Sequence, residues 1–154
     1  MPYYAGEPYT DGDFTIGPPN LPEILRLPLA DDVRADVDLY LRAAPASAAI
    51  EYFAIAWGGR LVGQILLHDI SWATGESLVG YHLFSRRDRG QGIGTRALRL
   101  LQRHVVERTP LRHLTIITTD DNLPSQRLAR ACGFLDAGPA REGPPLLVFR
   151  WEVR

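Results

Sequence analysis

A glycine-rich turn that leads directly into an amphipathic segment constrains this chain more than any other feature. The turn reads Arg-Gly-Gln-Gly-Ile-Gly-Thr over residues 89–95, and the segment from Arg96 to Thr109 carries its apolar residues on one side. Glycines at every second position allow positive φ angles and leave the backbone amides open to a ligand. At the start of a helix, such a turn collects N–H donors at the positive end of the helix dipole. The stretch therefore predicts a phosphate or pyrophosphate site, with a purely structural turn as the alternative.

The basic side chains other than histidine are all arginine, seventeen in number, and the chain has no lysine. A Walker-type phosphate loop needs a lysine after its last glycine, and Schiff-base chemistry needs a lysine amine, so both classes are excluded. The single cysteine, Cys132, excludes an internal disulfide and a multi-cysteine zinc site. We expect no metal.

Hydropathy and charge indicate where the protein works and what kinds of partner it binds. No apolar run reaches the roughly 18 residues of a membrane span, and the first residues lack the basic start of a signal peptide. We therefore expect a cytoplasmic protein with neither a membrane nor a nucleic acid as partner. Residues 1–60 hold nine acidic side chains against four arginines, and residues 61–154 hold nine against thirteen. This polarity suits an anion site in the second half and a cationic substrate near the first, although scattered surface charge explains it equally well.

Periodicity and turn residues predict the secondary structure. The turn at Gly58-Gly59 between two apolar runs indicates a β-hairpin, and the β-branched run at 114–119 suits a buried parallel strand. A strand, the glycine turn, a helix and a strand form a βαβ crossover, so we expect one domain over residues 23–154 with a mixed, α+β sheet. The expected elements are, in order, an irregular arm over 1–22, a strand over 23–27, a helix from Asp31, a short helix or loop over 43–49, strands over 51–57, 61–68 and 77–84, the helix over 96–109, the strand over 114–119, a helix over 124–132, and strands at Phe134 and 146–153.

Two motifs resemble a known family. The stretch Arg-x-x-Gly-x-Gly over residues 89–94 is similar to the acyl-CoA pyrophosphate loop of the GNAT superfamily of N-acetyltransferases. The stretch Asn-x-x-Ser-x-x-Leu from residue 122, with Gly-Phe at 133–134, is similar to its second signature. The resemblance covers residues 23–153 and is strongest to the branch of ribosomal-protein N-terminal acetyltransferases.

The resemblance implies a fold and a cosubstrate. It implies a mixed sheet of six to seven strands with flanking helices, in which a parallel pair of strands splays apart and holds the pantetheine arm of acetyl-CoA. A backbone N–H beside the gap would polarise the thioester carbonyl. The residues implied to contact acetyl-CoA are Leu83, Phe84, Arg89, Gly90, Gln91, Gly92, Gly94, Thr95, Asn122 and Ser125.

The catalytic side chains are harder to predict. Many members of the superfamily place a tyrosine acid where this chain has Ala129, so Ser125 is the nearest substitute for the acid. The alternative is that Ser125 is simply a polar residue in the first turn of a helix, with no catalytic role. His82 is the first candidate base because histidine titrates near neutrality, although a bulge that is common in this strand leaves its face undetermined. Glu76 and Glu51 are further candidates for a base or substrate anchor.

We expect the remaining histidines, Asp69 and Cys132 to have no direct catalytic role. His68 and Asp69, near the end of a hairpin strand, border the expected acceptor cleft. We expect His104 and His113 to be ordinary histidines, and Cys132 to be a core residue rather than a nucleophile.

These expectations combine into an acetyl-CoA-dependent N-acetyltransferase that works by direct attack of a primary amine in a ternary complex. A protein N-terminus is the first choice of acceptor, because an α-amino group has a pKa of about 7.7–8.0 and loses its proton more easily than lysine. Small amines such as aminoglycosides or polyamines are the alternative acceptors. Ala129 also keeps open a catalytically weak acyl-CoA-binding sensor. The sequence leaves open whether the protein forms a homodimer.

Overall fold

The computed structural model describes residues 3–29, 31–43 and 48–153, and every structural statement below concerns these residues. An eight-stranded sheet has the order β1-β2-β3-β4-β5-β6-β8-β7. The elements are β1 (Tyr9–Asp11), β2 (Phe14–Gly17), α1 (Leu21–Leu25), α2 (Asp31–Ala43), β3 (Glu51–Trp57), β4 (Arg60–Ser71), β5 (Glu76–Leu83), the 3₁₀ turn η2 (Arg86–Asp88), α3 (Ile93–Arg108), β6 (His113–Thr119), α4 (Leu123–Ala131), β7 (Leu135–Pro139) and β8 (Leu146–Glu152). The expected α+β architecture is confirmed, with eight strands in place of six to seven.

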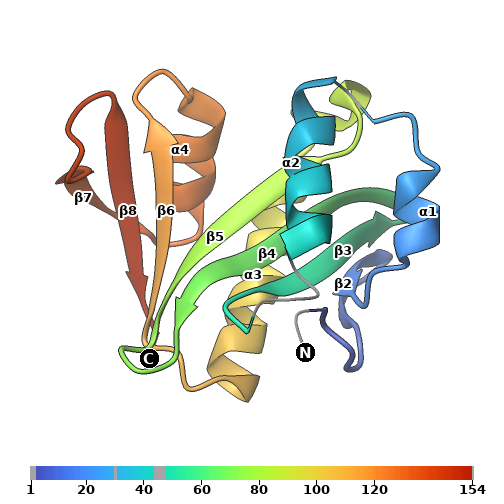
Figure 1. Cartoon of the computed structure of the whole chain (residues 1–154), viewed down its shortest axis with the longest axis horizontal. Helices are drawn as coiled ribbons and strands as arrows, with labels where there is room; N and C mark the ends of the chain where they lie inside the picture. Colours follow the sequence, from blue (N-terminus) through green and yellow to red (C-terminus); the bar gives the residue numbers. More distant parts are fainter. Residues whose placement is uncertain (1–2, 30, 44–47, 154) are drawn as a thin grey trace.

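The splay expected between the two parallel strands is confirmed. β5 and β6 pair in parallel only where Glu76–Leu78 meets His113–Thr115. β8 pairs with β6 over the full length of that strand, so β6 continues straight while β5 turns away from it. Figure 1 shows the two strands close together at their first residues and well apart at their last. We call the widening space between them the V gap.

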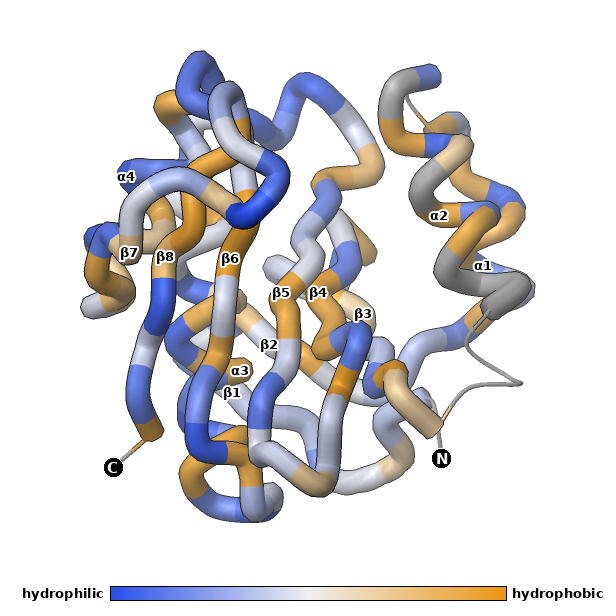
Figure 2. Tube along the Cα trace, turned by 60° about the vertical axis from the view of Figure 1, so that its left-hand side comes forward, coloured by the Kyte–Doolittle hydropathy of each residue, from blue (hydrophilic) through white to orange (hydrophobic). Residues whose placement is uncertain are grey.

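Helices cover the two faces of the sheet (Figure 1). On one face, α3 and α4 close the larger core with residues such as Leu101 and Ala129. On the other face, α1 and α2 pack on Tyr52 and Leu66 through apolar side chains that include Val37. Figure 2 shows apolar stretches along the central strands between these two layers. The V gap is therefore flanked by α3 and α4 on one face of the sheet and by α1 and α2 on the other.

The N-terminal arm is more regular than expected. Residues 9–17 form the β1–β2 hairpin, and β2 pairs antiparallel with β3, so the prediction of an irregular arm is wrong for them. Arg96 of α3 holds the hairpin: its Nε lies 3.2 Å from Asp11 Oδ2, and its guanidinium lies 4.6 Å from the ring centre of Phe14. Gly12 takes a φ of 63° in the Asp-Gly turn, and Asp-Gly is a typical hairpin signal. The strands beside it are only three and four residues long, too short to show a strand pattern in the sequence.

Two further expectations change in the α1–α2 region. The strand expected over 23–27 is wrong, because Leu21–Leu25 is a short helix whose first turn contains proline and whose N-cap, Asn20, accepts a hydrogen bond from the Glu23 N–H at 3.2 Å. The helix from Asp31 is confirmed as α2, but Leu39 is 60% exposed and does not join Val37 in the core. Of the segment 43–49, residues 44–47 lie outside the described residues.

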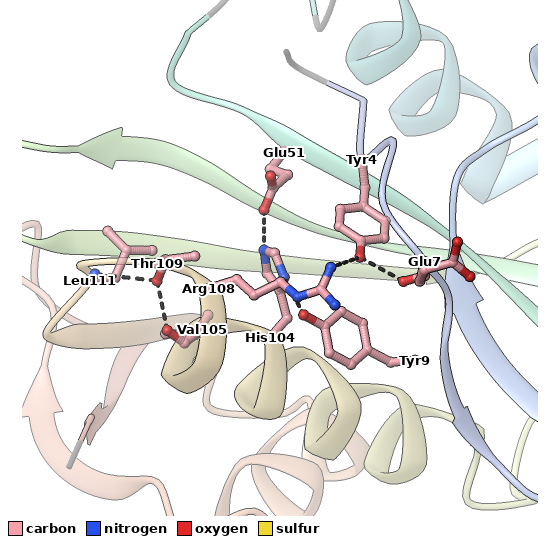
Figure 3. Close-up of polar contacts among 9 residues, drawn as sticks. All are labelled: Tyr4, Glu7, Tyr9, Glu51, His104, Val105, Arg108, Thr109 and Leu111. Carbon is pink, nitrogen blue, oxygen red and sulfur yellow. Dashed lines mark hydrogen bonds and ion pairs between the residues drawn. The ribbon is translucent and has the colours of Figure 1, made fainter.

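A buried polar cluster fastens the N-terminal hairpin to α3 and β3 (Figure 3). His104 is 3% exposed; its Nε2 lies 2.5 Å from Glu51 Oε1, and its Nδ1 lies 3.0 Å from the Tyr9 hydroxyl. Arg108 donates to the Tyr4 hydroxyl at 3.1 Å. Desolvation by burial raises the pKa of Tyr9 to about 12, so its hydroxyl keeps its proton at any ordinary pH. Glu51 is therefore held in this structural cluster on the α3 face, and it is not placed to act as a catalytic base.

Candidate active site

The glycine loop closes one side of the open end of the V gap. Gly90 and Gly92 both take a φ of 76°, and a Cβ atom at either position would meet nothing within 4 Å. Gly92 is the N-cap of α3, and no side chain of the described residues caps that helix. The first amides of α3 thus follow an exposed turn in which Gly90 and Gly92 carry no side chain. This opening fits the predicted phosphate site and a group as bulky as a pyrophosphate.

Gly94 serves a different purpose from the other two glycines. It is buried inside the first turn of α3 and is not among the residues with positive φ, so only Gly90 and Gly92 use the positive φ angles that the three glycines allow. A Cβ here would collide with Leu128 Cδ1 and would lie 3.0 Å from the ring of Tyr81. The missing side chain lets α3 pack closely on α4 and β5. For Gly94 only the amide N–H remains a candidate ligand contact.

An ion pair anchors the turn before the glycine loop. Asp88 is 3% exposed and accepts two hydrogen bonds from the Arg60 guanidinium, at 2.9 and 3.0 Å. These bonds hold the pKa of the Asp88 carboxyl below its usual range. A lowered carboxyl pKa means that the pair stabilises the fold above the usual aspartate pKa, and that this contribution is lost as the pH falls through the folded-state pKa.

Replacing Asp88 by asparagine should weaken coenzyme A binding about tenfold. The amide keeps only one acceptor oxygen and no negative charge, so the bidentate pair with Arg60 is lost and the turn that precedes Gly90 is held less firmly. Calorimetric titration with coenzyme A measures the change. The matched control is Asp136→Asn, which alters an exposed pair 3.7 Å from Arg130 and should leave the affinity unchanged. Equal affinities for wild type and Asp88→Asn would show that the anchor does not shape the loop.

The main chain of β5 offers its unpaired side to the V gap. The Phe84 N–H donates to the Val62 carbonyl on β4 at 2.9 Å, so the groups of Phe84 are directed at β4. Antiparallel pairing alternates, which turns the N–H and C=O groups of Tyr81 and Leu83 the other way, beyond the point where β6 leaves β5 at Leu78. The main chain of Leu83 therefore faces the gap, as the expected contact with acetyl-CoA requires. The main chain of Phe84 does not, and Tyr81 is the second residue of β5 whose main chain faces the gap.

His82 lies on the face of the sheet that carries α1 and α2. The β4–β5 register shifts between His68 and Ser71, where Asp69 has a φ of 50°, and it is regular from Leu78 to Leu83. A separate shift between β3 and β4, at Val62, does not disturb the pairing with β5. The face of His82 is thus defined. Its Nδ1 lies 3.0 Å from Gln64 Nε2 on the neighbouring strand. His68 lies on the same face, where its Nδ1 is 2.6 Å from Asp69 Oδ2.

Glu76 lies at the closed end of the V gap. It pairs with His113 at the first residue of β5, six residues before His82, which corresponds to roughly 20 Å along a strand. The structure therefore does not bring Glu76 and His82 together, and Glu76 is too far from the open end to act there.

The second motif lies across the gap from the glycine loop, at the start of α4. Asn122 caps this helix, since its Oδ1 accepts a hydrogen bond from the Ser125 N–H at 3.2 Å. The Asn122 amide nitrogen and the half-buried Ser125 hydroxyl remain candidates for contact with a ligand. Residue 129, where the resemblance would place a tyrosine acid, is a fully buried alanine, so this helix supplies no acid at that position.

Cys132 is a core residue, as expected. It is 7% exposed, burial raises the pKa of its thiol, and its Sγ donates to the Thr95 carbonyl at 3.6 Å. A thiol with a raised pKa is a poor nucleophile.

Three side chains of the central strands β3, β4 and β5 were not predicted to matter. Tyr81 packs its ring against Gly94, and burial raises the pKa of its phenol. Gln64 and Tyr52 are fully buried polar residues on β4 and β3. A glutamine inside the apolar run 61–67 was the one available signal, since a buried amide requires partners.

A cavity of about 360 Å³ opens on the His82 face beyond the end of β5. It is lined by the α1–α2 connection with Pro28 and Leu29, by Asp31, and by Ser85 and Arg86. A second cavity, of about 300 Å³, is lined by residues of β7 and β8 such as Leu135 and does not adjoin the glycine loop. The first cavity therefore has the better position for a second substrate. None of the described helices is both long and apolar enough to cross a membrane.

Comparison with known proteins gives a consistent answer. Residues 22–135 match the profile of the acetyltransferase (GNAT) domain family. YdaF of Bacillus subtilis (strain 168), a proposed ribosomal N-acetyltransferase, is 30% identical over 89 residues, which are 58% of this chain and 48% of YdaF. The chain thus spans about half the length of this curated relative.

Solved structures share the fold at low sequence identity. Microcin C7 self-immunity acetyltransferase MccE, in complex with acetyl-CoA and AMP, superposes with a TM-score of 0.74 at 16% identity over 93% of this chain and 94% of that one. RimL, a ribosomal L7/L12 α-N-protein acetyltransferase in complex with coenzyme A, superposes with a TM-score of 0.72 at 17% identity over 96% and 98%.

Proposed function

The chain belongs to the GNAT acetyltransferase family, and we propose that it transfers the acetyl group of acetyl-CoA to a primary amine by direct attack in a ternary complex. The observation that carries the proposal is the V gap. One strand of a parallel pair exposes its main chain there, with α3, whose N-cap is Gly92, on one side and the start of α4 on the other.

The groups around the gap suit the parts of acetyl-CoA. The open amides from Gly90 to Thr95 and the dipole of α3 would hold the pyrophosphate, with Arg89 and Gln91 beside them. The main chain of Tyr81 and Leu83 would pair with the amide-bearing pantetheine arm. Asn122 and Ser125 would face the same arm from α4. When bound, acetyl-CoA supplies an activated thioester.

The acceptor would approach from the face that carries α1 and α2. This face presents His82 and His68, and the cavity lined by Asp31 opens onto it. The names of YdaF and RimL support an α-amine of a ribosomal protein as acceptor. Small amines remain the alternative. A cytoplasmic location remains a prediction from the sequence, which leaves open whether the protein forms a homodimer.

The reaction needs few side chains. A neutral amine attacks the carbonyl carbon, and the thiolate leaves with the bonding electrons; a thiol pKa of about 8.5 makes it a tolerable leaving group. Holding amine and thioester together can supply about 7–11 kcal/mol of the barrier reduction. An α-amine with a pKa of about 7.7–8.0 is partly neutral near pH 7.5, so solvent can take its proton.

Acceptor-dependent release of free thiol tests the proposal. The purified protein, acetyl-CoA and a panel of peptides with free or blocked N-termini, together with polyamines and aminoglycosides, are compared by thiol-reactive dye. Release with free but not blocked peptides is expected. Tight acetyl-CoA binding without release for any amine would instead favour a sensor, the reading that the buried Ala129 permits.

Ser125→Ala should lower kcat about tenfold at neutral pH and progressively less at alkaline pH, because a thiolate needs no acid once the pH passes its pKa of about 8.5. The variant keeps the cap of α4, since the capping bond comes from the backbone N–H of residue 125. A pH–rate profile measures the effect. A rate equal to wild type at every pH would remove Ser125 from the reaction.

A further inference from the structure

We infer that Gln126 is a positioning residue: its side-chain amide joins the end of β6 to the first turn of α4 and so sets the direction in which Asn122 and Ser125 face the V gap. The bonds of Gln126 need no ligand. Their consequence for catalysis rests on the proposed acetyl transfer, in which Asn122 and Ser125 face the pantetheine arm.

Gln126 makes two hydrogen bonds from one amide nitrogen. Its Nε2 lies 3.1 Å from the Thr119 carbonyl oxygen and 3.0 Å from the Asp120 carbonyl oxygen. An amide nitrogen carries two hydrogens and a carbonyl oxygen only accepts, so each hydrogen has one acceptor. The inverted amide would set its oxygen against two other oxygens, which fixes the orientation. Gln126 is 6% exposed, so water competes little for either bond.

The two carbonyl groups lie where strand pairing comes to an end. The pairing of β5 with β6 stops at Thr115, and the ladder between β6 and β8 stops at Thr119. A main-chain carbonyl beyond a ladder needs a donor from another part of the chain. Gln126 supplies that donor to Asp120 and a second donor to the last residue of the strand.

The first turn of α4 has this amide as its anchor on the sheet. Leu123 is 54% exposed and Pro124 is exposed as well, so Gln126 is the first buried residue of the helix. The connection from β6 to α4 spans only residues 120–122 and is short in Figure 1 as well. A short connection with a buried polar anchor holds the start of the helix at a fixed distance from the end of the strand.

Asn122 and Ser125 are tied to the same anchor. The Asn122 N–H donates to the Thr119 carbonyl at 3.1 Å, so this carbonyl holds both Asn122 and Gln126. The Gln126 N–H donates to the Asn122 carbonyl at 3.2 Å, and Asn122 Oδ1 accepts from the Ser125 N–H at 3.2 Å. A displaced Gln126 amide would therefore shift both residues relative to the glycine loop across the gap.

Gln126→Leu removes both donors at similar side-chain volume, and it should weaken coenzyme A binding about tenfold, because the pantetheine arm loses well-placed partners on α4. ADP carries a pyrophosphate but no pantetheine arm. It should bind this variant as tightly as wild type, because the bonds of Gln126 lie on β6 and not on the glycine loop. Calorimetric titration, by competition for ADP, measures both affinities.

Gln102→Leu is the matched control. Gln102 is 9% exposed, and its Nε2 donates to the Cys132 carbonyl at the other end of α4, at 2.8 Å. Both variants lose a buried amide that donates to a main-chain carbonyl, so both should lose similar stability in urea unfolding. Only Gln126→Leu should lose affinity for coenzyme A. An equal loss in both variants, or a loss that extends to ADP, would reveal general destabilisation and overturn the inference.

Gln126→Glu tests the need for a donor, also if the leucine variant does not fold. A protonated carboxyl group can donate to one carbonyl, whereas a carboxylate would face two oxygens without a hydrogen. Burial and these oxygens favour the protonated form, which should persist toward neutral pH. The affinity for coenzyme A relative to wild type should then be higher at about pH 5.5 than at about pH 8. An affinity equal to wild type at both pH values would overturn the inference.

The rate at saturating acetyl-CoA separates positioning from affinity. Gln126→Leu should lower kcat about tenfold, because small displacements of reacting groups are costly, and Gln102→Leu should keep the wild-type kcat. Unchanged affinity together with unchanged kcat in Gln126→Leu would contradict the positioning role. Wild-type protein that transfers no acetyl group would contradict the proposed function, and the binding of coenzyme A and ADP would still decide the role of Gln126.

Discussion

Replacing Gly92 with valine should weaken acetyl-CoA binding by at least about 100-fold, which corresponds to about 2.7 kcal/mol. Gly92 has a φ of 76°, a conformation that a β-branched residue adopts only at a cost of about 1–2 kcal/mol. The side chain would also fill the open space in front of the first amides of α3, where the pyrophosphate is proposed to bind. Calorimetric titration with acetyl-CoA measures the affinity, and circular dichroism confirms the fold.

Gly59→Val separates backbone strain from ligand exclusion. Gly59 has the same φ of 76°, and a Cβ there also meets nothing within 4 Å, but it lies in the turn between β3 and β4. Both variants should lose similar stability, and only Gly92→Val should lose affinity. If both variants bound acetyl-CoA as tightly as wild type, the glycine loop would not be the phosphate site.

His104→Ala should lower the free energy of unfolding by about 3–5 kcal/mol. The imidazole is 3% exposed and is bonded to Glu51 and Tyr9, so its removal leaves two buried polar groups without their partner. It also leaves a space beside the stacked rings of Tyr4 and Phe53, whose centres lie 5.2 and 5.0 Å from the centre of the imidazole. Alanine is the best helix former, so helix propensity contributes nothing to the loss.

Urea unfolding of wild type and variant measures this difference. Glu107→Ala, which breaks an exposed i,i+4 pair with Arg103 on the same helix, should change the stability by less than about 0.5 kcal/mol. A loss below about 1 kcal/mol for His104→Ala would show that the cluster does not fasten the N-terminal hairpin.

Local signals made the second half of the fold predictable. The glycine turn, the apolar stripe of α3 and the proline and glycine that bound α4 each act within a few residues, and the structure confirms all three elements. The β1–β2 hairpin was missed because its strands are three and four residues long. Contacts far along the chain hold it in place, such as that of Arg96 with Asp11, 85 residues away, and no local pattern encodes such a contact.

The candidate site was only partly predictable for a related reason. The motifs located the loop and the start of α4, because a backbone site depends on glycine and cap positions that the sequence displays. Whether Tyr81 or Phe84 faces the V gap depends on the hydrogen-bonding alternation with β4, which a single strand does not reveal. The partners of His82 required the register of three strands.

Position along a strand and on a face of the sheet explains why neither glutamate is placed to act as a base. Glu76 and Glu51 are plausible bases by residue type, but one lies at the closed end of β5 and the other on the α3 face beside His104. Residue chemistry alone does not distinguish the two ends of a strand or the two faces of a sheet.

The most direct test of the account is to locate the transferred acetyl group. The protein is incubated with acetyl-CoA and a peptide that has a free N-terminus and one internal lysine, and the product is sequenced by tandem mass spectrometry. The account predicts one acetyl group on the α-amine, none on the lysine, and no product with Gly92→Val at the same acetyl-CoA concentration. An unmodified peptide despite saturating, tight acetyl-CoA binding would contradict it.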